Sequence, residues 1–140
     1  VISSLIKKDY KKENRNAFIN KEHIRTLNHK EETFLTNLMN YVETIWNKPN
    51  FSIAEFSQAL GFSGSHIYRK IKSLSGKPPN SFVRDFRLNR ALNLLHKRKG
   101  NITAIAAQTG FKSATYFTKC FKDNFGVTPT TYSKQHTFSN

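Results

Sequence analysis

Apolar residues recur along this chain at the three- and four-residue spacing of amphipathic helices. The first such run starts at Glu31 and stops at Lys48-Pro49-Asn50. Further runs are predicted at 53–60, 63–75, 79–98, 102–109 and 113–125, and a last short helix begins at Thr128-Pro129. The pattern therefore predicts an all-α fold of about seven helices.

Residues with capping and turn chemistry separate these runs. Ser52 and Glu55 have the spacing of a capping box, in which the Ser hydroxyl accepts from a backbone N–H and the Glu reaches back to the cap. Gly61 is free to adopt a positive φ, and Ser63 is suited to cap the next helix. Gly100 is expected to end the long helix at 79–98.

The same helix, turn and helix occur twice. Four positions within 53–62 match positions within 102–111 at an offset of 49, and after one extra residue in the turn, six positions within 67–82 match positions within 117–132 at an offset of 50. Ten matched positions with one shift indicate an internal duplication.

Each copy has the spacing of a DNA-binding helix-turn-helix: a small residue, a Gly four residues later and an apolar lock six further on. In the first copy these residues are Ser57, Gly61 and Ile67. In the second copy Ala106 and Gly110 fit, and the lock is either Tyr116 or Phe117. The alternative is an ordinary αα-hairpin that binds no ligand. Two copies of the motif in a strongly basic chain make this alternative less favoured.

Charge sharpens this interpretation. The 140-residue chain has a formal net charge of +14, and residues 51–140 alone carry 14 basic and three acidic side chains. So strong a bias in a segment rich in Phe and Tyr is typical of a nucleic-acid binder. One Cys and five scattered His residues favour neither a disulfide nor a metal site. No catalytic motif is present, so we expect no enzyme activity, cofactor or metal.

At this point the sequence resembles the AraC/XylS family of bacterial transcription regulators. The matching residues are Ile105-Ala106, Gly110-Phe111, Tyr116-Phe117, Phe121-Lys122, Phe125-Gly126, Thr128-Pro129 and Tyr132, with Arg87-Leu88, Ala91 and Leu94-Leu95 in the joining helix. Ala107 departs from the Glu or Tyr common in the family. The resemblance covers 34–135 and implies two helix-turn-helix subdomains joined by a long central helix.

The resulting domain organisation starts with a polar linker, or the remnant of an upstream domain, at residues 1–30. The DNA-binding domain follows at 31–140, with a first unit at 34–76, a linker helix at 79–98 and a second unit at 101–136. Because the first residue is Val1 rather than Met, we expect a longer natural chain. The resemblance is greatest to output domains of sensor or response-regulator chains, including hybrid two-component systems.

A recognition helix presents its N-terminal and outward side chains to base edges in the major groove. The predicted base-reading residues are Ser65, His66, Tyr68, Arg69, Ala114, Thr115, Thr118 and Lys119. The predicted phosphate contacts are Ser63, Lys70, Lys72, Arg84, Arg90, Lys112, Ser113 and Lys122. Among the base-reading residues, Arg69 is the candidate for a bidentate guanine contact. For each Lys, an ordinary solvated charge is the alternative.

Three other residues are interpreted as structural. Arg87, close in sequence to Asp85, is expected to form an ion pair with it. Cys120 shares a helix face with Phe117 and Phe121 and is expected to be buried. Trp46 is expected to pack in a core.

These features predict sequence-specific binding of double-stranded DNA that regulates transcription, as the output module of a larger bacterial regulator. The partners expected are operator or promoter DNA, RNA polymerase and an upstream sensor or receiver domain. We expect a cytoplasmic, nucleoid-associated domain without membrane contact, even within a membrane-anchored parent. The alternatives are a small stand-alone regulator of the same family, a non-specific RNA or single-strand binder, and a protein- or membrane-interacting helix bundle.

Overall fold

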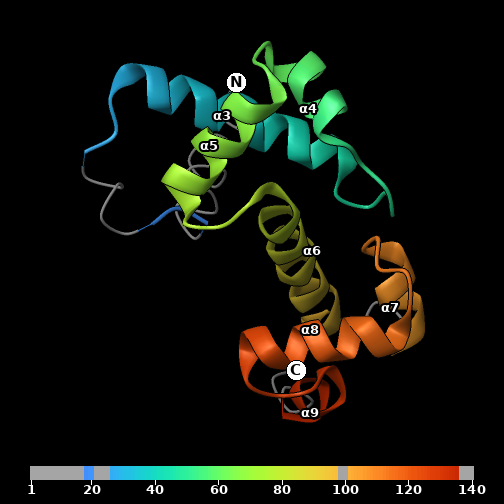
Figure 1. Cartoon of the computed structure of the whole chain (residues 1–140). Helices are drawn as coiled ribbons and strands as arrows, with labels where there is room; N and C mark the ends of the chain where they lie inside the picture. The colour runs from blue at the N-terminus through green and yellow to red at the C-terminus, as the bar shows by residue number, and fades with distance from the viewer. Residues whose placement is uncertain (1–17, 21–25, 98–100, 136–140) are drawn as a thin grey trace, which may run out of the picture. The chain divides into compact units, whose positions relative to one another are not determined.

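The computed structural model of the protein describes residues 18–20, 26–97 and 101–135. Within these ranges the chain forms seven helices and no strand, which confirms the predicted all-α fold (Figure 1). The helices are α3 (His29–Ile45), α4 (Ile53–Leu60), α5 (Gly64–Ser75), α6 (Pro79–His96), α7 (Ile102–Gln108), α8 (Ala114–Phe125) and α9 (Pro129–Gln135).

Helix ends follow local side-chain chemistry. The predicted cap of α4 forms, because the Ser52 hydroxyl accepts from the Glu55 N–H at 3.2 Å. The Glu55 carboxylate also reaches back to the cap, where it accepts from the Ser52 hydroxyl at 3.2 Å. A second capping box was missed: Asn28 Oδ1 accepts from the Glu31 N–H at 2.9 Å, and the Asn28 N–H donates to Glu31 Oε1 at 3.1 Å. The first helix therefore starts at His29, two residues before the predicted Glu31.

The long helix ends at His96 rather than at the predicted Arg98, and Arg98 lies outside the described residues. The chain divides into two compact units. Unit 1 comprises residues 1–44 and 52–82, and unit 2 comprises residues 45–51 and 83–140. Helix α6 is continuous across residues 82 and 83, where the chain passes from one unit to the other.

Unit 1 is built from α3, α4 and α5 around one apolar core. Its fully or nearly fully buried side chains include Leu35, Leu38, Val42, Phe56, Ile67 and Ile71. Edge-to-face ring pairs connect α3 to the rest, with centroids 4.9 Å apart for Tyr41 and Phe56 and 5.9 Å apart for Phe34 and Phe62. These contacts hold α4 and α5 in a fixed arrangement on α3.

Residues 18–20 also belong to this unit, which the interpretation of residues 1–30 as a linker did not anticipate. The Asn20 N–H donates to the Leu74 carbonyl at the end of α5 at 2.8 Å. Ile19 is buried, and the rings of Phe18 and Phe82 lie 5.8 Å apart. This short stretch therefore covers the C-terminal end of α5.

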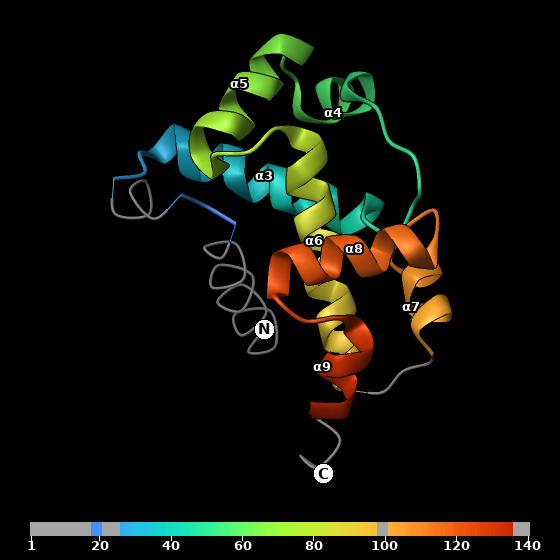
Figure 2. The same cartoon turned by 60° about the horizontal axis from the view of Figure 1, so that its bottom comes forward.

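Unit 2 has its own core between α6, α7, α8 and α9. A row of rings crosses it, with centroid distances of 5.1 Å from Phe111 to Phe117, 5.8 Å from Phe117 to Phe121 and 4.6 Å from Phe121 to Phe125. Tyr132 of α9 closes the row 6.0 Å from Phe121, and Figure 2 shows α9 beside α8. Cys120 is buried in this core, as predicted.

The segment before α4 supplies Trp46 to unit 2. Its ring lies 6.5 Å from Phe86 of α6, and the Arg90 guanidinium lies 5.5 Å from the indole centroid. Trp46 thus packs against the described core residues of α6 as expected, although its side chain is only half-buried.

Candidate nucleic-acid interface

Each unit contains the same turn between two helices. The turn in unit 1 uses Gly61 at φ 79°, and the turn in unit 2 uses Gly110 at φ 84°, both left-handed conformations that favour glycine. The second helix then starts in both units from a capped Ser. Ser63 Oγ accepts from the His66 N–H at 3.3 Å, and Ser113 Oγ accepts from the Tyr116 N–H at 3.1 Å. The duplication seen in the sequence is therefore also a structural one.

The packing inside each turn follows the helix-turn-helix spacing. The Ser57 hydroxyl donates to the Phe62 carbonyl in unit 1, whereas Ala106 at the matching position of unit 2 is buried. Ile67 and Phe117 are both fully buried as the apolar locks. The choice left open in the sequence is thus decided for Phe117, whereas Tyr116 is exposed, with its ring 6.1 Å from that of the core residue Phe111.

The outward face of α5 carries most of the predicted base-reading residues of unit 1. Ser65, Tyr68 and Arg69 are exposed, and 43% of Tyr68 is accessible to solvent. The Lys72 ammonium lies 5.9 Å from the Tyr68 ring centroid, one helical turn later. His66 differs from these three because it is half-buried with its ring 4.9 Å from that of Phe62.

Arg69 is loosely held in the free protein. Its Nε–H is 3.4 Å from the Ser65 carbonyl, near the long limit of a hydrogen bond. The side chain lines a shallow pocket of about 330 Å³ that it shares with Lys70 of α5 and Glu31 of α3. The guanidinium is therefore exposed and available to a ligand at little cost in broken contacts.

The outward face of α8 is shorter in side chains and less basic. Thr115 and Lys119 are exposed, whereas Thr118 is half-buried. Ala114 is partly buried and packs against the core of unit 2, so part of the methyl group predicted to meet thymine faces inward. The matching residue in α5 is Gly64, where an added Cβ would lie 2.8 Å from Ile53 Cγ2. Both positions are thus fixed by close helix packing.

Tyr116 is the exposed residue that the sequence prediction missed, with 51% of its surface accessible. The pKa of its phenol is raised by the neighbouring Cys120 thiol and by burial, and Arg84 opposes this shift. The sequence did contain a signal for this exposure. The offset of 50 between the two repeats pairs Tyr116 with His66, which is not a core position, and pairs Phe117 with the apolar lock Ile67.

The predicted phosphate contacts fall into two groups. Ser63, Lys72, Lys112, Ser113 and Lys122 are exposed. Lys70, Arg84 and Arg90 are half-buried. The Lys70 ammonium lies 5.1 Å and 5.0 Å from the rings of Phe34 and Phe62, and the Arg90 guanidinium lies 5.1 Å from Phe86.

Arg87 does not form the contact predicted for it. Its Nε–H donates to the Trp46 carbonyl at 2.8 Å and its Nη2 group donates to the Lys48 carbonyl at 2.5 Å. The ion pair that the structure shows for Asp85 is instead with Arg84, at 3.5 Å. Successive residues on a helix point in different directions, and the side chain of Arg87 is turned toward residues 46–48, which the local sequence could not reveal.

The described surface of the repeated region, residues 51–135, has few exposed carboxylates. Of the three carboxylates after residue 50, Asp85 is buried, and only Glu55 and Asp123 are exposed. The first turns of α5 and α8 contain no acidic residue. Both second helices therefore present polar and cationic side chains next to a helix N-terminus, an arrangement that favours polyanions.

Comparisons with known proteins agree with this geometry. The family model described as a helix-turn-helix domain matches residues 56–135. Histidine kinase P4 of Formosa agariphila is 37% identical over 123 residues, which cover 85% of this chain and 9% of that protein. The uncharacterised HTH-type transcriptional regulator YdeC of Bacillus subtilis is 31% identical over 98 residues, or 70% of this chain and 32% of YdeC. The chain thus spans less than a third of the length of either relative.

A solved structure shows the same architecture. The crystal structure of a transcriptional regulator from Chromobacterium violaceum, described as an AraC-type DNA-binding domain-containing protein, has a TM-score of 0.72 and 25% sequence identity. The match covers 81% of this chain and all of that one. The matched family model covers most of the first repeat and all of the second, and both YdeC and the Chromobacterium violaceum protein are described as transcription regulators. The chain belongs to the helix-turn-helix domain family of AraC type, whose members are DNA-binding domains of transcription regulators.

Proposed function

We propose that this chain recognises specific sequences in double-stranded DNA through α5 and α8, and that it regulates transcription. The observation that carries the proposal is the repeated geometry itself. In each unit the second helix is capped by Ser, locked by one fully buried residue and polar on its outer face. A helix held in this way enters the major groove as a rigid element.

Arg69 is the proposed main base-reading residue of α5. Its guanidinium is exposed and loosely held, and two parallel N–H groups match the O6 and N7 acceptors of guanine. Ser65 and Tyr68 share its face, and the half-buried His66 lies at the edge of that face. In α8 we propose Thr115 and Lys119 as base contacts, with smaller contributions from the partly covered Ala114 and Thr118.

Phosphate contacts are proposed around the exposed cations and the two capping residues. Lys72, Lys112 and Lys122 extend into solvent, and the hydroxyls of Ser63 and Ser113 still have a proton to donate while they accept from the backbone. Lys70, Arg84 and Arg90 are held against rings or a carboxylate, so we propose that they act at longer range.

The distribution of aromatic side chains favours duplex over single-stranded nucleic acid. Proteins that bind single strands stack successive bases on exposed aromatic rings. In the described part of the chain the large hydrophobic residues that are exposed are Tyr68 and Tyr116, one in each unit, whereas the rings of Phe56, Phe117 and Phe121 are fully buried. Two isolated Tyr side chains do not form a continuous stacking platform.

Selection of bound duplexes from a random pool tests the proposal directly. We expect a defined motif to be enriched, and a duplex that contains it to compete better than single-stranded DNA, RNA or a scrambled duplex. Enrichment without a motif, or equal competition by single strands, would contradict the proposal and support the non-specific alternative.

Substitution of Arg69 tests the division between base and phosphate contacts. Arg69→Ala is expected to relax base preference at one position of the motif, at a cost of about 1–3 kcal/mol in binding free energy. Lys122→Ala, the matched loss of a proposed phosphate contact, is expected to weaken the selected and scrambled duplexes equally. Repeating the selection with each variant measures both effects, and an unchanged motif with Arg69→Ala would show that Arg69 does not read a base.

The place of the chain in a larger protein is also proposed. Similarity to a segment of a histidine kinase supports a role as the output domain of a two-component or related sensor regulator. An upstream sensor or receiver domain and RNA polymerase are the partners that such a role requires. Among the described residues, no helix has the length and apolar character needed to cross a bilayer.

A further inference from the structure

The guanidinium of Arg87 is a buried charge with neutral partners. Only 9% of the side chain is exposed, and in the described part of the chain its hydrogen bonds go to the carbonyls of Trp46 and Lys48. The Phe51 ring lies 5.6 Å from the guanidinium carbon. Burial lowers the pKa of Arg87, the shift expected for a cation that has lost water without gaining a full counter-charge.

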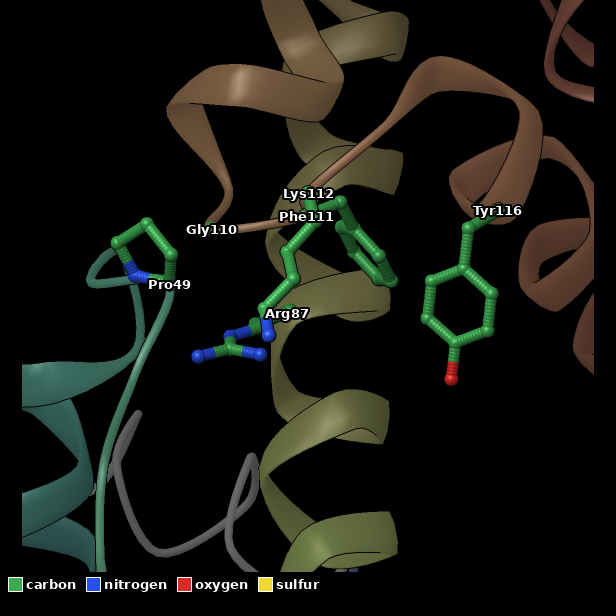
Figure 3. A pocket seen from close by; sticks show the side chains of 6 residues that line it. All are labelled: Pro49, Arg87, Gly110, Phe111, Lys112 and Tyr116. Carbon is green, nitrogen blue, oxygen red and sulfur yellow. The ribbon is translucent and has the colours of Figure 1, made fainter.

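A cavity of about 410 Å³ lies beside this guanidinium (Figure 3). Its lining combines two cations with apolar and aromatic groups: Pro49, Arg87, Gly110, Phe111, Lys112 and Tyr116. The volume lies within the range of small-molecule sites, which are mostly apolar with a few polar groups that fix orientation. All six residues belong to unit 2.

The cavity lies beside the proposed base-reading face of α8 and meets the proposed DNA-contacting surface at Lys112, which is also a proposed phosphate contact. Tyr116 follows Thr115 by one residue, which places it about 100° further around the helix, and it shares a side of α8 with the buried Cys120. The cavity therefore opens on the flank of α8.

We propose that unit 2 contains a binding site for a small carboxylic acid with an apolar body. The carboxylate is placed next to Arg87 and Lys112, and the apolar body packs against Pro49, Phe111 and Tyr116. Within the described residues the guanidinium is bonded to backbone carbonyls and to no carboxylate, and such a ligand supplies that counter-charge. Because Gly110, Phe111 and Lys112 form the turn between α7 and α8, the ligand contacts the segment that orients α8.

The single tryptophan of the chain, Trp46, is a built-in reporter because its carbonyl accepts from Arg87. Its fluorescence is to be followed during titration with cyclohexanecarboxylate, the neutral cyclohexanecarboxamide and inorganic phosphate. We expect a saturable change with the carboxylate, and binding at least about tenfold weaker for the amide, which lacks the charge. Equal binding of the amide would overturn the proposal, and phosphate binding as tight as the carboxylate would reduce the site to an adventitious anion site only.

Two variants locate the site without disturbing the bonds of Arg87. Lys112→Gln is expected to weaken carboxylate binding about tenfold, because it removes a charged donor, and Tyr116→Ala is expected to weaken it by loss of apolar contact. Lys134→Gln, the same change at an exposed position of α9, is expected to leave it unchanged. Binding that survives both Lys112→Gln and Tyr116→Ala would overturn the proposal. The titrations contain no DNA, so their outcome is independent of the proposed function.

Discussion

Raising the salt concentration from about 50 to about 200 mM is expected to weaken DNA binding by this chain about 10³- to 10⁵-fold. The reason is the release of counterions from DNA, which scales with the number of phosphates that the protein neutralises. The eight proposed phosphate-contacting residues belong to a region that carries 14 basic and three acidic side chains. Fluorescence anisotropy with one labelled duplex at four or five salt concentrations measures the slope.

Substitutions of single Lys residues then show which cations contribute to this dependence of affinity on salt concentration, the slope of log affinity against log salt. Lys122→Gln is expected to reduce it by about one unit, because one phosphate contact is lost. Lys134→Gln removes the same charge from α9, outside the proposed interface, and is expected to leave the slope unchanged. A flat salt response of the parent chain would contradict binding of any nucleic acid by this surface, and equal effects of the two variants would contradict the assigned positions.

The helices were predictable because their signals are local. Ser52, Ser63 and Ser113 cap the helices that the sequence assigned to them. Gly61 with its positive φ ends the first helix of one repeat, and Gly110 with its positive φ follows the C-cap Thr109 in the other. The missed start of α3 had an equally local signal in the spacing of Asn28 and Glu31. Helix capping depends on residues three positions apart, so the local sequence is enough to predict it.

Contacts between distant segments were not predictable in the same way. The partners of Arg87 lie 39 and 41 residues earlier in the chain, and both are backbone carbonyls, which carry no residue-type signal. An acidic neighbour in sequence suggested an ion pair, but tertiary packing decided the direction of the side chain. The contact of residues 18–20 with the end of α5 was hidden for the same reason.

The candidate site was predictable to the level of helix faces. Position on the helix placed Ser65, Arg69, Thr115 and Lys119 correctly on the outside. The degree of exposure of their neighbours depends on what packs beside each helix. His66 and Lys70 meet the Phe62 ring, and Ala114 meets the core of unit 2. These contacts arise from other elements and have no counterpart in the local pattern.

Gly110 is constrained both by its own backbone conformation and by close contacts with residues distant in sequence. Its φ of 84° disfavours any side chain, at a cost of about 1–2 kcal/mol for an L-residue. A Cβ at this position would also lie 2.8 Å from the Trp46 carbonyl oxygen and 2.9 Å from Arg87 Nε. These two atoms are joined by a hydrogen bond. Moving either atom away from an added Cβ would strain that hydrogen bond.

Gly110→Ala is therefore expected to destabilise unit 2 by about 2–5 kcal/mol, as the sum of backbone strain and of an overpacking cost of about 1–3 kcal/mol. Gly126→Ala is the matched control, because Gly126 also has a positive φ, at 82°, but nothing lies within 4 Å of an added Cβ. This control is expected to cost only the strain, about 1–2 kcal/mol. Urea unfolding followed by Trp46 fluorescence reports on unit 2, which contains this residue. Equal losses in the two variants would show that the turn has room to move, and that the close approach of Gly110 to Arg87 does not constrain the fold.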